Sequence, residues 1–443
     1  MSASFKGPSP SREGVPDTAG HDIKYQQGFG GELSSEAVVG VLPIGQNSPQ
    51  VLPHGLLHEI VSGTTFTAPR ALNRRTHVYR IRPSASPSEL KRLQSTKFTS
   101  APLTGEPDPN PIRWNAFTVP TAEQDFVDGI VTLCANGSVA LQTGIAVHIY
   151  LANRSMVDRA FSNADGELLV LPQAGKLRLV TEYGVLDVSP GELALIPRGC
   201  KFRVELLSPE ARGFVCENYG VPFRLPELGL IGSTGQANAW DFQVPVAAFE
   251  DHEKTTQLIH KFGGRLWAAD LDHSPFDIVA WRGNYLPCKY DMCRFMVLGA
   301  VAFDHAEPSV YCALTSPSDS VAGPNADFMI LPPRWLVAEH TFRPATFHRN
   351  CVGEFLAVIS DASEGKRADD GSLHNNWAPH GPSAAVVDAA RTEQQPPMRL
   401  DRLAFMIESR YAFCVSEYAR EAPERDLRYL NHWAGFRNKF SGH

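Results

Sequence analysis

The sequence predicts a mainly β fold of sandwich or barrel units with a few peripheral helices, and three observations support this. The 35 glycines and 34 prolines are spread along all 443 residues, and such punctuation interrupts helices. Between them lie apolar runs of about four to eight residues, the usual length of strands. With 43% apolar and 20% charged residues, the chain has the composition of a globular protein, and its length suits two or three domains.

Charge and targeting signals exclude several classes of function. The chain carries 41 Lys and Arg against 48 Asp and Glu, a net charge of −7, and it has no long basic block, so we expect no nucleic-acid partner. No apolar stretch is long enough for a transmembrane helix, and the first residues contain no apolar signal segment. We therefore expect a cytoplasmic protein without a membrane partner. The eight cysteines are scattered without a CxxC pair, which argues against a disulfide scaffold or a zinc ribbon.

The apolar runs divide into two sets. After a segment expected to be frayed at 1–22, a first β domain is expected over 23–285 and a second β domain, which would hold the chemistry, over 286–443. Strands of the first set are expected at Gly144–Leu151, Glu167–Pro172, Leu177–Tyr183, Glu192–Pro197 and Phe202–Leu206. Strands of the second set are expected at 277–281, 294–298, 326–331 and 354–359, with helices at 384–392 and 424–441.

A short motif at the end of the first set concerns metal binding. Gly191, Pro197 and Gly199 have the spacing of the second motif of the cupin β-barrel family, which this stretch resembles. In a metal-binding cupin a histidine would stand at the place of Phe202. Because a phenyl ring has no lone pair to donate, the first barrel is predicted to be cupin-like and free of metal.

The second set contains a group of candidate metal ligands. Five histidines lie between 300 and 382, at positions 305, 340, 348, 374 and 380. The most informative pair is His348 and Glu354, a nitrogen and an oxygen ligand six residues apart. An extended chain would hold them roughly 20 Å apart, so a shared ion requires a turn between them, for which Asn350 and Gly353 are suitable. A third ligand could come from His374 or from His380.

Two histidines and one carboxylate are typical of mononuclear non-haem Fe(II) sites with open positions for substrate and O₂. The same three ligands also suit a catalytic zinc ion. Each histidine could instead serve the fold alone, by capping a turn or binding a buried carbonyl. The residue types leave these three interpretations open.

Several motifs in order along the chain resemble homogentisate 1,2-dioxygenase. The longest is HRNCVGEF at 348–355; the others are QGFG at 27–30, FTAPR at 66–70, IRW at 112–114, AFDHA at 302–306, ILPPRW at 330–335, TFRP at 341–344, GSLH at 371–374 and PHGP at 379–382. The resemblance implies a cupin-like Fe(II) enzyme of tyrosine and phenylalanine catabolism, which opens homogentisate to maleylacetoacetate with O₂. It also implies a small aromatic substrate and a homo-oligomer, a hexamer.

The resemblance assigns roles by position. His348, Glu354 and His380 would be the iron ligands, with His380 also lining the substrate site. His305 would be the catalytic base that binds a substrate hydroxyl, and His374 would line the pocket.

The sequence departs from the family pattern at the expected substrate contacts. Ser363 stands where the family has a tyrosine, the loop at 364–371 is shorter, and Arg282 replaces a histidine. Ser363 keeps a hydroxyl, and Arg282, Lys366 or Arg367 could bind a substrate carboxylate. These changes keep alternatives open: a paralogue acting on another substituted hydroquinone, or a non-catalytic β-barrel that binds a ligand, with a zinc hydrolase the weakest.

Overall fold

The structure is a computed structural model that describes residues 23–94, 97–227, 236–298, 302–361, 371–392 and 394–441. The segment expected to be frayed at 1–22 lies outside the described residues, as do Ser363, Lys366 and Arg367. The described residues form 28 strands but only two α-helices, α1 (Ala384–Thr392) and α2 (Glu417–Glu421). The prediction of a mainly β chain with few peripheral helices is confirmed. None of the described helices is long and apolar enough to span a membrane.

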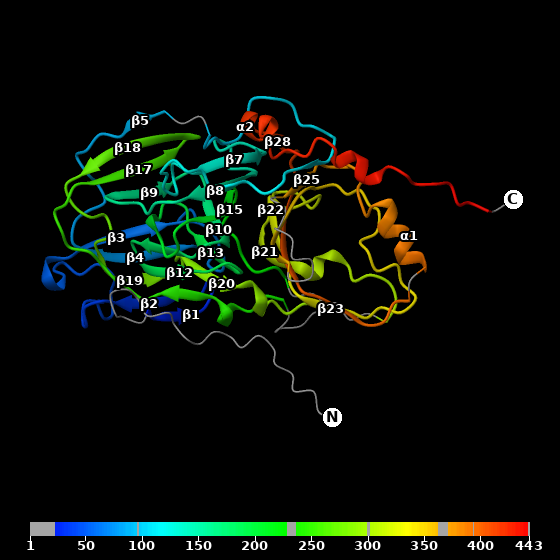
Figure 1. Cartoon of the computed structure of the whole chain (residues 1–443). Coiled ribbons are helices and arrows are strands. Elements are labelled where there is room, and N and C mark those ends of the chain that lie inside the picture. The colour runs from blue at the N-terminus through cyan, green and yellow to red at the C-terminus, as the bar shows by residue number, and fades with distance from the viewer. Residues whose placement is uncertain are drawn as a thin grey trace.

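The N-terminal half forms three sheets (Figure 1). The largest has nine strands in the order β1 (Tyr25–Gln27), β16 (Gln243–Pro245), β20 (Cys288–Asp291), β13 (Glu192–Ile196), β10 (Glu167–Ala174), β15 (Ala211–Asn218), β8 (Ile145–Ala152), β7 (Ile130–Ala135) and β28 (Cys414–Val415). A seven-stranded sheet has the order β12 (Gly184–Val188), β11 (Leu177–Thr181), β14 (Lys201–Leu206), β9 (Arg159–Asn163), β17 (Thr256–Phe262), β18 (Arg265–Leu271) and β5 (Lys91–Leu93). A four-stranded sheet has the order β2 (Leu33–Glu36), β19 (Ile278–Gly283), β4 (Arg75–Arg80) and β3 (Leu57–Ser62).

The C-terminal half forms two smaller sheets. The six-stranded one has the order β21 (Cys312–Ser316), β22 (Ala326–Leu331), β27 (Arg402–Ser409), β24 (Gly353–Asp361), β25 (Ser372–His374) and β6 (Ile112–Arg113). The other pairs β23 (Arg334–Leu336) with β26 (Met398–Leu400). The halves exchange strands, since β6 comes from the N-terminal half and β28, in the nine-stranded sheet, comes from the C-terminal half.

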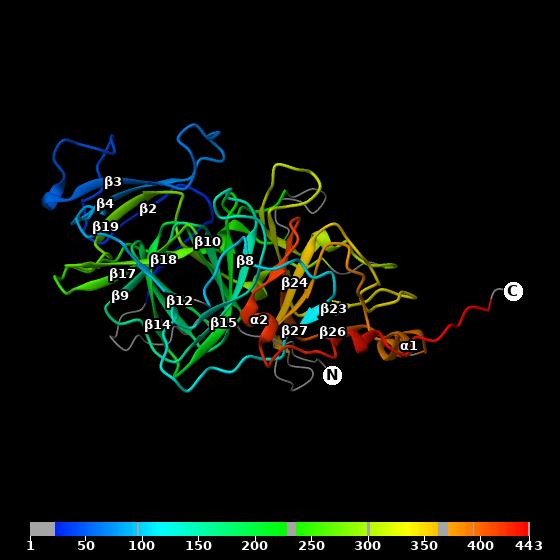
Figure 2. The same ribbon diagram turned by 90° about the horizontal axis from the view of Figure 1, so that it is seen from above.

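The nine-stranded sheet is the middle layer of the molecule. Side chains alternate between the two faces of a strand, and this sheet packs on both. Tyr150 of β8 contacts Phe126, which in turn meets Phe202 of the seven-stranded sheet. From the opposite face Phe214 of β15 meets Phe355 and Phe405 of the six-stranded sheet. Figures 1 and 2 both show the yellow and orange strands beside β15 and β8.

Burial on both faces explains why some strands, such as β8, have continuous apolar sequences. All eight residues of β8 and all eight of β15 are buried. A strand that packs on two sides carries few polar positions, so its sequence shows an unbroken run rather than an alternation. The five strands predicted between residues 144 and 206 are confirmed as β8, β10, β11, β13 and β14.

Three predicted elements differ from the structure. Residues 294–298 are not a strand, because the Asp291 side chain accepts from the backbone N–H of Cys293 and starts a 3₁₀ turn over Met292–Arg294. The strand expected at 277–281 exists as β19, but it pairs with β2 and β4 in the N-terminal half. The second predicted helix, at 424–441, is reduced to the 3₁₀ helix η5 (Tyr429–Trp433).

The loss of the second helix has a physical reason. Short helices depend on tertiary packing of an apolar face, and Leu427 and Leu430 are both exposed here. Gly435 then takes a left-handed φ of 89°, which ends the turn. The helix predicted at 384–392 is confirmed as α1.

Candidate metal centre

Glu354 is the second residue of β24, and its neighbours across the sheet are charged or polar. It lies opposite His374 of β25 on one side and opposite Glu408 of β27 on the other. Residues directly opposite each other in antiparallel strands point to the same face, so these three side chains share one face of the sheet. The Glu354 side chain is only 6% exposed, and a carboxylate buried to this degree needs a partner.

The partners are two histidines from loops, His348 and His380. Their backbones form an isolated antiparallel bridge, in which each N–H donates to the other's carbonyl at 3.1 Å. This bridge brings together residues 32 positions apart in the chain and places their rings 4.1 Å apart. His348 therefore stands in a loop bridge and does not end a regular strand.

Both rings are held in the same way, by a hydrogen bond to the backbone carbonyl two residues earlier in the chain. The Nδ1 of His348 lies 2.8 Å from the Thr346 carbonyl, and the Nδ1 of His380 lies 2.9 Å from the Ala378 carbonyl. A carbonyl oxygen only accepts, so each Nδ1 carries the hydrogen and each Nε2 keeps a lone pair in the neutral ring. Both histidines thus present Nε2 as the available ligand atom.

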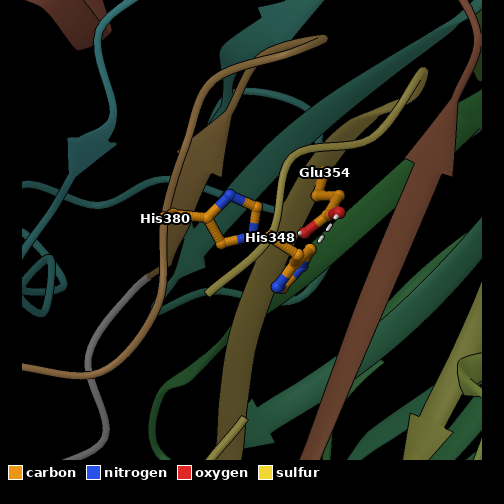
Figure 3. A group of neighbouring side chains, drawn as sticks. All are labelled: His348, Glu354 and His380. Atoms are coloured by element: carbon orange, nitrogen blue, oxygen red, sulfur yellow. Dashed lines mark hydrogen bonds and ion pairs between the residues drawn. The ribbon is translucent and has the colours of Figure 1, made fainter. Parts of the chain in front are cut away.

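The three ligand atoms converge on one point (Figure 3). One ligand atom each from His348, Glu354 and His380 lie within 4.8 Å of one another. The Nε2 of His380 lies 3.1 Å from Glu354 Oε2, and the Nε2 of His348 lies 3.8 Å from Glu354 Oε1. Ligands on adjacent positions of an ion with bonds of about 2.1 Å stand about 3 Å apart, so the donor set and its spacing fit a divalent metal ion.

Electrostatics favour a cation at this point. Burial by itself raises the pKa of Glu354, but hydrogen bonds with His348, His380 and Asn350 outweigh burial and lower its pKa well below the usual range. The hydrogen bond with Glu354 in turn raises the pKa of His348. The Glu354 carboxylate stays charged and favours a proton on the His348 ring. A bound metal ion would take the place of that proton. The His348 side chain is 41% exposed, so the centre opens to solvent on that side.

His374 is the third histidine at the centre, and its contacts separate it from the three ligand candidates. Its ring stacks on that of His380 at 4.0 Å and 12°, and its Nε2 lies 3.0 Å from the hydroxyl of Tyr429. Burial and the neighbouring His380 lower the pKa of His374 to about 3, so its ring is neutral. This nitrogen is already bonded to Tyr429, which leaves His380 as the third member of the cluster.

Glu408 is a residue of this site that the sequence analysis missed. It lies between Glu354 and Asp327 on neighbouring strands, and burial together with these two carboxylates raises its pKa to about 8. An acid within the apolar strand Phe405-Met-Ile-Glu408 is the signal that could have identified it. Asn350, expected only as a turn residue, also donates to Glu354 Oε1.

The remaining predicted site residues have no described contact with the three ligands. His305 is exposed, and its Nε2 donates to the Phe342 carbonyl. This contact matches the structural role that a histidine can have in place of a catalytic one. Arg282 lies on β19 in the four-stranded sheet and donates to the Pro43 carbonyl at 3.0 Å. Ser363 lies outside the described residues. A role of these residues at the substrate stays a prediction.

Comparisons with known proteins identify the family. The family model described as homogentisate 1,2-dioxygenase N-terminal matches residues 24–292, and the one described as homogentisate 1,2-dioxygenase C-terminal matches residues 293–440. Together the two matches span almost the whole chain, including all three ligand candidates.

Similarity to solved structures is weak. A mutant of oxalate decarboxylase from Bacillus subtilis is 10% identical, covers 73% of this chain and 80% of its own, and has a TM-score of 0.27. A cupin 2 conserved barrel domain protein from Leptotrichia buccalis is 9% identical, covers 70% of this chain and 99% of its own, and has a TM-score of 0.28. Similarity at this level assigns no role to any residue.

Proposed function

We propose that this chain, which belongs to the homogentisate 1,2-dioxygenase family, is an Fe(II)-dependent enzyme that opens the ring of homogentisate to give maleylacetoacetate. The single observation that carries the proposal is the convergence of His348, Glu354 and His380 on one point. Two imidazoles and one carboxylate are the ligand set of mononuclear non-haem iron oxygenases. The reaction balances with the two substrates alone, because both atoms of O₂ enter the product and no external reductant is consumed.

A ferrous ion held by these residues would supply open positions for the substrate hydroxyl and O₂ and a route for electrons between them. The chain's own residues prepare the site for this chemistry. The carbonyls of Thr346 and Ala378 fix the two ligand rings with Nε2 inward, so little reorganisation is needed when the ion binds. Glu354 contributes the negative charge that offsets a divalent cation.

Proton transfer is assigned to His305, as the family resemblance implies. An imidazole with a usual pKa near 6.5 can accept the proton that a hydroquinone hydroxyl loses when it binds a cation. We assign no base role to His374, because its Nε2 already lies 3.0 Å from the Tyr429 hydroxyl and burial lowers its pKa. We assign His374 and His380 to the wall of the substrate site, with Ser363 and Arg282 as further candidate contacts.

The proposal extends to the setting of the reaction. It places the chain in tyrosine and phenylalanine catabolism, in the cytoplasm, as a homo-oligomer of six copies. The resemblance of the motifs and the sequence expectations support this part of the proposal.

A second candidate function is the opening of a different substituted hydroquinone. Ser363 in place of the family's tyrosine, and the shorter loop that follows, favour it, because both alter the expected substrate wall.

Anaerobic reconstitution with Fe(II), followed by homogentisate and air, tests the proposal. We expect one O₂ consumed per substrate and a ring-opened product, with no turnover by zinc-loaded protein. Gentisate and bulkier hydroquinones in parallel separate the two candidate substrates by kcat/KM. Iron bound at the site without turnover of any hydroquinone would refute the proposal and favour a ligand-binding role.

A further inference from the structure

The C-terminal segment Tyr429–Phe436, here called the C-terminal brace, contacts the surroundings of every histidine at the metal centre. It contains the 3₁₀ helix η5 and lies beyond the last strand of the six-stranded sheet. Three of its aromatic side chains make these contacts, each to a different part of the centre.

The first contact is through Tyr429. Its hydroxyl lies 3.0 Å from His374 Nε2, and His374 stacks on the ligand His380. Tyr429 is itself held in place, because the Arg113 guanidinium lies 4.5 Å over its ring and forms an ion pair with Asp426 at 2.6 Å. Because Arg113 and Trp433 both contact the Tyr429 ring, the Tyr429 hydroxyl can fix the orientation of the His374 ring.

The second and third contacts reach the ligand loops. The indole Nε1 of Trp433 donates to the carbonyl of Gly381 at 2.9 Å, and Gly381 directly follows His380. The ring of Phe436 meets that of Phe347 edge to face at 5.5 Å, and Phe347 directly precedes His348. Both ligand histidines therefore sit next to a residue that the brace touches.

We propose that the C-terminal brace positions the metal-binding histidines, with Tyr429 and Trp433 as its positioning residues. His348 and His380 lie in loops, where their mutual bridge and the bonds of each Nδ1 to a nearby carbonyl keep Nε2 of both rings beside Glu354. The brace adds a fixed wall behind this bridge and reduces the freedom of both loops. Ligand orientation set in this way raises metal affinity, because less ordering is left to occur on binding. The inference rests on the proposed metal centre but not on the reaction.

Cobalt binding tests the brace, because Co(II) suits nitrogen and oxygen ligands and reports its coordination through its visible absorption. The variants are Tyr429→Phe, which keeps the ring, Trp433→Phe, which removes the indole N–H together with part of the ring, and the two combined. Leu430→Ala is the matched control, since Leu430 belongs to η5 and its side chain is 51% exposed. Thermal unfolding of the metal-free proteins shows whether all four variants remain folded.

We expect each single variant to weaken Co(II) binding by about two- to tenfold, the usual effect of one lost hydrogen bond. The double variant should lose about tenfold or more and shift the Co(II) spectrum, while Leu430→Ala keeps the affinity and spectrum of the parent protein. If the double variant does not fold, the loss of a single oxygen atom in Tyr429→Phe decides the question.

Unchanged cobalt affinity and spectrum in the folded variants would overturn the inference. Failure of the parent protein to bind cobalt would overturn it together with the metal centre. If the brace variants weaken cobalt binding while the iron-loaded parent opens no hydroquinone, the positioning role stands and only the proposed reaction fails.

Discussion

Replacing Lys261 by Met should destabilise the protein strongly, because Lys261 neutralises two carboxylates inside the N-terminal β unit. Its ammonium lies 3.0 Å from Asp165 and 2.5 Å from Glu217, and its side chain is only 1% exposed. The two carboxylates are also buried, so the variant leaves two negative charges without their cation. Removing one partner of a buried ion pair costs about 3–5 kcal/mol.

We expect a loss of unfolding free energy near the lower end of this range, about 3 kcal/mol, because both carboxylates keep other hydrogen bonds in the variant. Asp165 still accepts from the backbone N–H groups of Gly263 and Gly264, and Glu217 still accepts from Asn163 at 2.7 Å. These donors stabilise the charges in part but carry no full positive charge themselves.

Urea unfolding followed by tryptophan fluorescence and circular dichroism measures the effect. Lys254→Met is the matched control, because Lys254 also binds a carboxylate, that of Asp158 at 2.6 Å, but is 63% exposed. An exposed pair of this kind contributes about 1 kcal/mol or less. If both variants lost the same small amount of stability, the argument that burial makes Lys261 indispensable would be refuted. Adding Glu217→Gln to Lys261→Met should recover part of the loss, because one unpaired charge is then removed.

Three further predictions concern acid stability, the ligand set and the substrate. Despite its burial, Lys261 and His148 lower the pKa of Glu217 to about 2 from 4.5, so its stabilisation is complete above about pH 4.5 and is lost as the pH falls towards 2. The free energy of unfolding of the parent minus that of Glu217→Gln should therefore shrink by up to about 3 kcal/mol between pH 6 and pH 2.5, and a constant difference would contradict the cause given. Glu354→Gln keeps the shape of the ligand but removes its charge, so metal analysis after dialysis should show at least about 100-fold weaker iron binding, and full retention of iron would exclude Glu354 as a ligand. If Arg282 binds the substrate carboxylate, Arg282→Gln should raise KM for homogentisate about tenfold with little change in kcat, whereas an unchanged KM would leave Arg282 only its bond to Pro43.

Five strands of the nine-stranded and seven-stranded sheets, β8, β10, β11, β13 and β14, were predictable because each is specified by its own residues. The strand Ile145–Ala152 is apolar at nearly every position because both of its faces are buried. Its eight consecutive residues are therefore enough to predict it. The helix Ala384–Thr392 was predictable for a similar reason. The helix expected at 424–441 failed because its apolar residues do not share one packed face: Leu427 and Leu430 are exposed while Tyr429 is buried, and no local pattern contains this.

The sequence alone determined the predicted strand segments other than 294–298, the residue types of the metal centre and, through its motifs, the family. Only the tertiary structure decided which side chains meet: that His348 and His380 bridge each other, that Tyr429 occupies a nitrogen of His374, and that Glu408 and Lys261 are buried beside other charges. The physical reason is the range of the interactions. A strand is specified by its own few residues, whereas a metal centre depends on loops far apart in the chain, which are brought together by packing that no single segment encodes.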